Sequence, residues 1–219
     1  MTPEDNLKQN NNPEERPTVK GTLLLGLLKY TREKLGPEGR VHLLKSLNDE
    51  DRVVFFESAD SPKFKKISVA EWYPYRTFKS LLGAIVREVG KGDKRLCIEI
   101  GHWSAEQDFD PEKGILKFYT KDVYKGKANL IYRSTPVIWS QMFSKGEIEF
   151  ETIEEAKKGV LRLKGFPEVT EANCLLIGAW MERATKIISG FETKVETKYN
   201  PAIDTDCDFH LEVKDSPKK

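Results

Sequence analysis

Apolar residues recur at helical spacing through the first two thirds of the chain. In each segment they fall at intervals of three and four residues, which places them on one face of an α-helix. Gly36 and Pro37 separate the first two helices, and the last segment is expected to break near Gly126 and Pro136. The helices predicted in this way span residues 20–35, 37–46, 76–89, 94–108 and 115–143.

From Gly146 onward the pattern changes to an alternation of apolar and polar residues, which is typical of strands with one solvent-facing side. The first two of these segments predict a β-hairpin. Thr170 is suited to cap a helix over residues 171–189, and Gly190 is suited to end it. The strands predicted from the alternation span residues 147–151, 160–164, 191–199 and 207–213.

This order of elements predicts an α+β fold, in which an antiparallel sheet packs on helices. A helical part, residues 18–145, and a β-β-α-β-β part, residues 146–213, are expected to form one domain. The polar ends, residues 1–17 and 214–219, bury too little apolar surface to offset the entropy of ordering, so both are expected to be disordered.

The charge balance narrows the classes of partner. The chain has 219 residues, and its 36 Lys and Arg against 35 Asp and Glu give a net charge of +1. A general binder of nucleic acid or of membrane surfaces would need a basic excess, so neither partner is expected. The apolar run at residues 23–28 is far shorter than the roughly 20 residues of a membrane span. Three widely spaced cysteines favour free thiols and a cytoplasmic location.

Catalytic motifs are not found. The chain has no serine nucleophile elbow and no glycine-rich phosphate loop. Its acid-rich stretches at residues 154–155 and 204–208 fall in predicted turns or edges, where solvated carboxylates are common. The sequence therefore predicts a domain that is not an enzyme.

Aromatic residues are the best candidates for a ligand pocket between helix 171–189 and the sheet. Such side chains line apolar cavities, but they fill ordinary cores equally well, and both interpretations remain open. Gly178 is included because a residue without a side chain on helix 171–189 would leave room for a ligand. The candidate pocket residues are Trp72, Tyr73, Trp103, Phe118, Trp139, Phe143, Gly178 and Trp180.

Several landmarks, in this order and spacing, resemble a paralogous family of unknown function that is abundant in myxobacteria. The resemblance covers roughly residues 18–213. It rests on RLKGFP (162–167), Cys174, GAWMERA (178–184), the Ser189-Gly190 pair, DCDFHLEV (206–213), Lys20-Gly21, Trp72-Tyr73-Pro74, residues 101–105 and Ile138-Trp139-Ser140.

The C-terminal half is also similar, more remotely, to the 4-vinyl reductase domain. That resemblance implies the fold of TRAPP vesicle-tethering subunits and of the aromatic-sensing domains of phenol-responsive activators. Haem-dependent nitric-oxide sensors are a weaker, general analogy. The phenol sensors bind a structural zinc, and Cys174, Glu196 and Cys207 match three of its ligands here. Tyr199 replaces the fourth, so the set is degenerate, and a pair of buried core cysteines is the alternative.

His102, beside Trp103, is a candidate haem or metal ligand, but no second His or Cys lies at ligand spacing. The expectation is therefore that the domain has no cofactor, with zinc and haem as the alternatives.

Three functional hypotheses follow. The first is a non-catalytic sensor or adaptor in signalling, which binds a small apolar ligand or a partner protein. The second is a structural homodimer that pairs through helix 115–143. The third is an enzyme or a haem sensor that uses His102.

Overall fold

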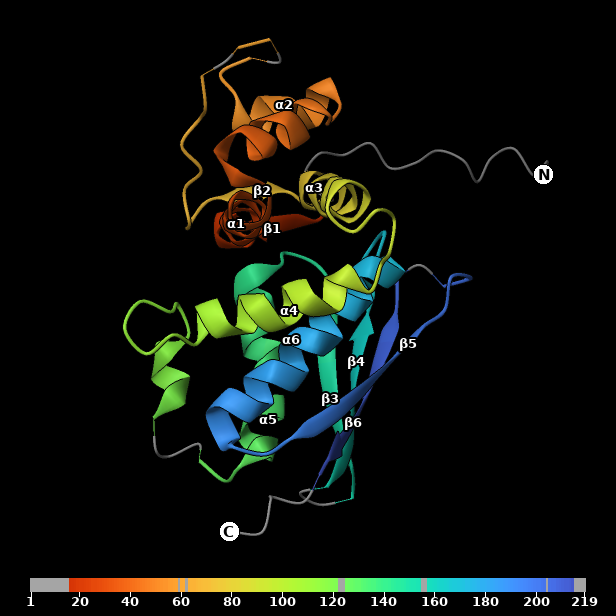
Figure 1. Ribbon diagram of the computed structural model, residues 1–219. Helices are drawn as coiled ribbons and strands as arrows, with labels where there is room; N and C mark the ends of the chain where they lie inside the picture. The colour runs from red at the N-terminus through yellow and green to blue at the C-terminus, as the bar shows by residue number, and fades with distance from the viewer. Residues whose placement is uncertain are drawn as a thin grey trace, which may run out of the picture.

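The computed structural model describes residues 16–214 except residues 59, 62, 122–124, 155–156 and 204. Helices and strands fall in two groups, which Figure 1 shows one above the other. The N-terminal layer comprises β1 (Thr18–Lys20), α1 (Gly21–Lys45), α2 (Asp49–Phe55), β2 (Trp72–Pro74) and α3 (Tyr75–Glu88). The C-terminal body comprises α4 (Leu96–Asp108), the short 3₁₀ helix η3 (Lys117–Thr120), α5 (Ala128–Met142), β3 (Glu147–Glu154), β4 (Lys158–Lys164), α6 (Glu171–Ser189), β5 (Thr193–Tyr199) and β6 (Cys207–Val213).

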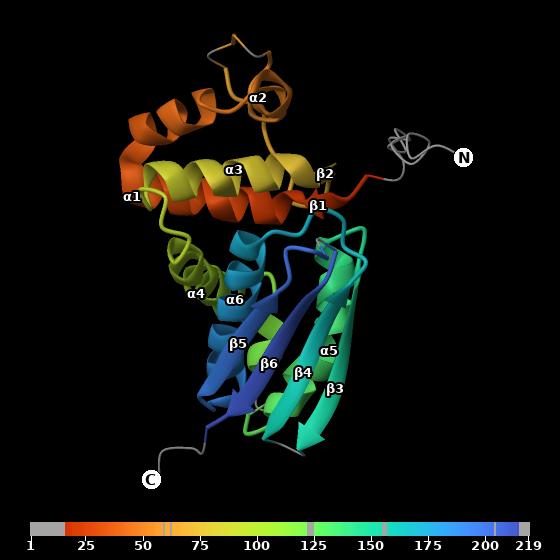
Figure 2. The ribbon, with the colours of Figure 1, turned by 90° about the vertical axis from the view of Figure 1, so that its right-hand side faces the viewer.

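The C-terminal body is built on an antiparallel sheet of order β3-β4-β6-β5. Leu161 of β4 pairs with Phe209 of β6, and both side chains are fully buried. Figure 2 shows that α5 and α6 lie behind the sheet, and Figure 1 shows α4 crossing α6 on the side away from the sheet. The predicted α+β class is confirmed, and so are the four strands.

The N-terminal layer lies across one end of the C-terminal body. Its helices α1 and α3 run side by side in Figure 2, and β1 pairs with β2 in a small antiparallel ladder. Tyr75 at the start of α3 donates a hydrogen bond of 2.8 Å to Asn173 at the start of α6. Lys79 forms an ion pair with Glu168 in the segment before α6. These contacts attach the layer to the body at the N-terminal end of α6.

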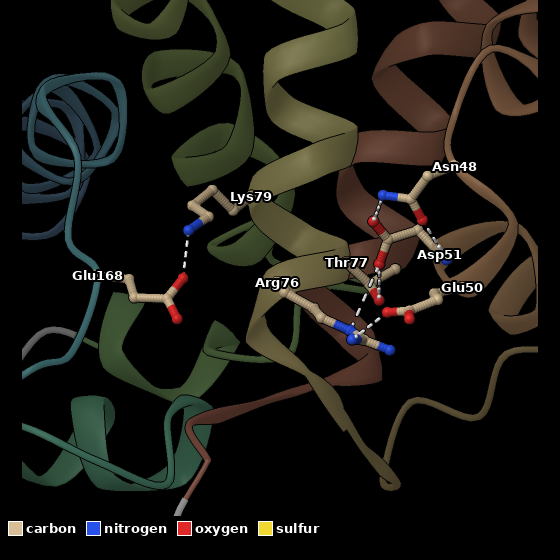
Figure 3. A network of polar contacts seen from close by, with 7 residues as sticks. All are labelled: Asn48, Glu50, Asp51, Arg76, Thr77, Lys79 and Glu168. Carbon is tan, nitrogen blue, oxygen red and sulfur yellow. Dashed lines mark hydrogen bonds and ion pairs between the residues drawn. The ribbon is translucent and has the colours of Figure 1, made fainter. Parts of the chain in front are cut away.

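A polar network, drawn in Figure 3, holds α2 against α3. Asn48 caps α2 by accepting a 2.8 Å hydrogen bond from the backbone N–H of Asp51. The buried Asp51 carboxylate accepts a 2.8 Å hydrogen bond from the Thr77 hydroxyl of α3. Arg76 of α3 also pairs with Glu50. A helix of seven residues is marginal alone, so these contacts to α3 stabilise it.

The sequence pattern missed α2 and the β1–β2 ladder. No helix is predicted from the sequence over residues 49–55, because a seven-residue helix gives too short an apolar period to recognise. The predicted break between the first two helices is confirmed: within the range of α1, Gly36 has non-helical dihedral angles (φ 72°, ψ 178°), which glycine tolerates, and two helices meet at a kink there.

The long helix predicted over residues 115–143 is wrong in its first half. Among the described residues of this range, only 128–142 are α-helical, and they follow the 3₁₀ turn η3. Pro136 lies inside α5 without breaking it, because buried Ile131, Ile138 and Trp139 hold the helix against the body. That apolar face is used within the protomer, so it is not free to form the expected dimer seam. A homodimer remains a prediction, and so do the domain boundaries; residues 1–15 and 215–219 lie outside the described residues.

Replacing Asp51 by Ala should lower the free energy of unfolding by about 2 kcal/mol, because the Thr77 hydroxyl and the Asn48 side-chain amide each lose the carboxylate that accepts their hydrogen bond. Urea denaturation measures the change. Asp49→Ala is the control, since the Asp49 side chain is 74% exposed and pairs only with Arg52 along the same helix. Equal stabilities of the two variants would contradict the role assigned to Asp51.

Candidate ligand-binding site

A cavity of about 120 Å³ lies where the N-terminal layer meets the C-terminal body. Its walls come from α1, α3, α4, α5, α6 and β3, so six elements distant in sequence enclose it. Most of the wall is apolar, which is typical of sites for small molecules. The apolar lining includes Leu23, Leu27, Phe78, Leu116, Ile138, Met142, Ile148, Phe166, Leu176, Ile177 and Met181.

The helix pair α4–α6 sets the position of one wall. A Cβ atom on Gly101 of α4 would lie 2.3 Å from the carbonyl oxygen of Leu176 and 2.8 Å from the Cβ of Ala179. The helices can therefore cross this closely only with glycine at the crossing. The crossing brings Trp103 of α4 and Trp180 of α6 into the same wall of the cavity.

Asp108, the last residue of α4, places a carboxylate in this wall. Its Oδ2 accepts a 2.8 Å hydrogen bond from the indole Nε1 of Trp180. Removal from water raises the pKa of the Asp108 carboxyl to about 6, and the hydrogen bond from Trp180 opposes this rise. Among the described residues, no Lys, Arg or His forms an ion pair with Asp108.

A second polar group of the wall is already paired. Asn173 is buried at the start of α6, where its Oδ1 accepts hydrogen bonds from Tyr75 and from Thr170. Burial raises the pKa of the Tyr75 phenol well above its ordinary value, so this hydroxyl remains a donor. Thr170 also caps α6, as the sequence predicted.

Four of the eight predicted pocket residues lie together in the cavity wall: Trp103, Trp139, Phe143 and Trp180. Trp139 and Phe143 stack with ring centroids 4.0 Å apart, and the Trp139 indole donates a 3.0 Å hydrogen bond to the Lys145 carbonyl. Whether these residues bind a ligand remains a prediction.

The other four predicted residues lie elsewhere. Trp72 and Tyr73 are on β2, where the Lys20 ammonium lies 4.1 Å from the centroid of the Trp72 ring. Phe118 is on η3 and is 53% exposed. Gly178 faces the sheet, because a Cβ there would lie 2.4 Å from the Thr197 hydroxyl.

The residues predicted as metal ligands do not lie together at one site. His102 lies beside Glu182 of α6, with 3.5 Å between Nε2 and Oε1, and it is not part of the cavity wall. Cys174 and Cys207 are buried free thiols, and the contact with Cys174 raises the pKa of Cys207. Glu196 is exposed on the other face of the sheet. In the described part of the chain, no three His, Cys, Asp or Glu side chains are grouped to bind a metal.

The sequence did not reveal Asp108, Tyr75 or Asn173 as members of the site. One signal was present for Asp108: it follows Ile100 and Ser104 at intervals of four, so a charged residue lies on the same face of α4 as the buried Ile100. A charge in such a row is a reason to examine the position for function.

No protein-family model matches this chain. No curated protein matches it either. Among the described helices, none combines the length and the apolar character needed to cross a membrane.

The fold is similar to that of solved H-NOX domains. An Fe(II) unliganded H-NOX mutant from K. algicida is 14% identical, covers 90% of this chain and 97% of its own, and has a TM-score of 0.57. An H-NOX protein from S. oneidensis in the Fe(II)NO state is 12% identical over 90% of this chain and 100% of its own, with a TM-score of 0.58. A structure concerned with haem redox potential and porphyrin distortion is 12% identical, covers 90% and 99% of the two chains, and has a TM-score of 0.56.

These similarities correct two expectations. The resemblance to the 4-vinyl reductase domain and TRAPP subunits is wrong, because the similar structures are H-NOX domains. Short sequence motifs in a matching order were weaker evidence of a shared fold than the arrangement of whole helices and strands. The expectation of no cofactor is also contradicted, because the similar structures include Fe(II) H-NOX proteins and one that concerns haem and its porphyrin.

The residues of the cavity wall nevertheless do not fit a haem. Protein ligands to haem iron are His, Cys, Tyr or a Met paired with His. Among the described residues, neither a His nor a Cys lines the cavity, and the Tyr75 hydroxyl is engaged with Asn173. The described part of the wall also has no Lys or Arg that could pair with haem propionates. The cavity is also near the size of an engineered one of about 150 Å³ that holds benzene, and a porphyrin is several times larger.

Replacing Asp108 by Asn should stabilise the protein at neutral pH. The raised pKa means that the folded state binds more protons than the unfolded state between about pH 4 and 6, so wild-type stability falls as the pH rises through this window. A rise of about two pKa units corresponds to at most about 3 kcal/mol. We expect the variant to gain on the order of 1–3 kcal/mol at pH 7.5 and little at pH 4. Urea denaturation at both pH values measures this, and equal gains at both would contradict it.

Proposed function

We propose that this chain is a non-catalytic sensor domain that binds a small, mainly apolar molecule in the cavity. The observation that carries the proposal is the position of the cavity between two packed groups of elements. Its wall includes Leu27 of α1 and Phe78 of α3 on one side, and Ile177 and Met181 of α6 on the other. A molecule that fills this space would contact both groups at once and favour one relative packing of them.

The same geometry gives a route for the signal. Close to the cavity, the N-terminal layer is attached to the body by the Tyr75–Asn173 hydrogen bond and the Lys79–Glu168 ion pair. Tyr75 and Asn173 both line the cavity. An occupant would therefore act on the contact that joins the two groups, and a partner protein that binds across both would detect the change.

A non-catalytic role is supported by the composition of the wall. Ser104 is the serine of the described wall, and no histidine lies among the described lining residues to act as its general base. Catalysis by an activated nucleophile is not supported by such a site.

Gly26→Leu should block binding without unfolding the protein. Gly26 lines the cavity from α1, and a Cβ there would meet no atom within 4 Å. Leucine would fill the space and would also favour the helix by up to about 1 kcal/mol. Calorimetric titration with benzene should show saturable binding to the wild type and none to this variant.

Gly83→Leu on α3 is the matched control, because Gly83 is also helical and roomy but does not line the cavity. It should bind benzene like the wild type. Equal binding by the wild type and Gly26→Leu, or no binding by the wild type, would contradict the proposal. Gly178→Leu is unsuitable for this test because its side chain would strike Thr197 in the sheet.

A haem-dependent sensor is a second candidate, and the fold similarity to H-NOX domains favours it. This candidate predicts a saturable Soret band when hemin is titrated into the purified protein, and loss of that band in Gly26→Leu. The absorption spectrum thus separates the two candidates. A spectrum that remains that of free hemin would contradict this one.

A further inference from the structure

Asp108 differs from the other carboxylates around the end of α4. Glu106 pairs with Arg183 of α6 at 2.6 Å, and Asp110 accepts hydrogen bonds from the backbone N–H groups of Glu112 and Lys113. Lys29 of α1 lies near this end of α4, where its ammonium donates a hydrogen bond to the side chain of Gln107. Within the described residues, Asp108 has the neutral Trp180 indole as its side-chain partner and no cation.

The surroundings of Asp108 make a charged carboxylate costly. It lines a mainly apolar cavity, and it stands at the C-terminal end of α4, where the helix dipole disfavours negative charge. These conditions agree with its raised pKa. The carboxylate is therefore largely ionised at neutral pH without a compensating cation, and a cation placed in the cavity would remove the cost.

The location of Asp108 also suits the binding of a charged group. The backbone carbonyl of Asp108 accepts a 2.8 Å hydrogen bond from Leu116, and the adjacent Ile115 lines the cavity while 41% exposed. Asp108 thus lies near the open side of the cavity, where a ligand cation would keep part of its hydration. The polar pair deeper in the wall, Tyr75 and Asn173, is already hydrogen-bonded.

We propose that the ligand of the cavity is a small apolar molecule that carries a cationic amine, and that the Asp108 carboxylate binds this amine. This inference rests on the proposed function and specifies its ligand. The apolar part would lie between α1, α5 and α6, and the ammonium would pair with Oδ1 of Asp108 while Trp180 keeps its bond to Oδ2.

Benzylamine and ethylbenzene test this, because they have nearly the same shape and differ in an ammonium against a methyl group. Calorimetric titration at pH 7.5 should show that the wild type binds benzylamine more tightly than ethylbenzene. Asp108→Asn should weaken benzylamine binding by at least about tenfold, since one partner of a partly buried charge pair is lost. Ethylbenzene binding should be unchanged, because Asn can still accept the Trp180 hydrogen bond.

Asp110→Asn is the matched control and should leave both affinities as in the wild type, because Asp110 does not line the cavity. Circular dichroism checks that each variant is folded. If the wild type binds both probes equally, or if Asp108→Asn keeps the preference for benzylamine, the amine proposal is overturned while the apolar site stands. If neither probe binds the wild type, the proposed function itself fails.

Discussion

The close crossing of α4 and α6 at Gly101 is the contact on which the arrangement of this domain depends. Because no side chain separates the two backbones there, α4 is held against α6 rather than against the sheet. Trp103 and Asp108 then follow along α4 into the same wall as Trp180. A larger residue at position 101 would move the helices apart and separate the Trp180 indole from the carboxylate that it now contacts.

The cavity forms because the N-terminal layer and the C-terminal body do not pack completely against each other. The N-terminal layer presents apolar side chains from α1 and α3, and the body presents those of α5, α6 and β3, yet the two surfaces leave a space. Voids of this size weaken packing, and a carboxylate beside one weakens it further. The stability lost at this junction is what a bound molecule could restore, so ligand affinity and unliganded stability are linked here.

Local signals in the sequence predicted the parts of the fold that depend on near neighbours. The alternation in residues 147–213 predicted four strands, and Thr170 and Gly190 marked the ends of α6 correctly. The elements that were missed depend on distant partners: α2 is held by Thr77 of α3, and β1 pairs with β2 more than 50 residues later. Only half of the residues predicted to line the cavity do so, because aromatic character does not say on which side of a helix or layer a residue will lie.

Three of the four tryptophans of the chain, Trp103, Trp139 and Trp180, line the cavity, and Trp72 lies outside it on β2. Indole emission depends on the polarity and on the quenching groups around the ring, and two of these rings, Trp103 and Trp180, donate a hydrogen bond to a carboxylate. Intrinsic fluorescence of the unlabelled chain is therefore weighted toward the interior of the site. The domain carries its own optical probe of occupancy, placed there by the same residues that form the wall.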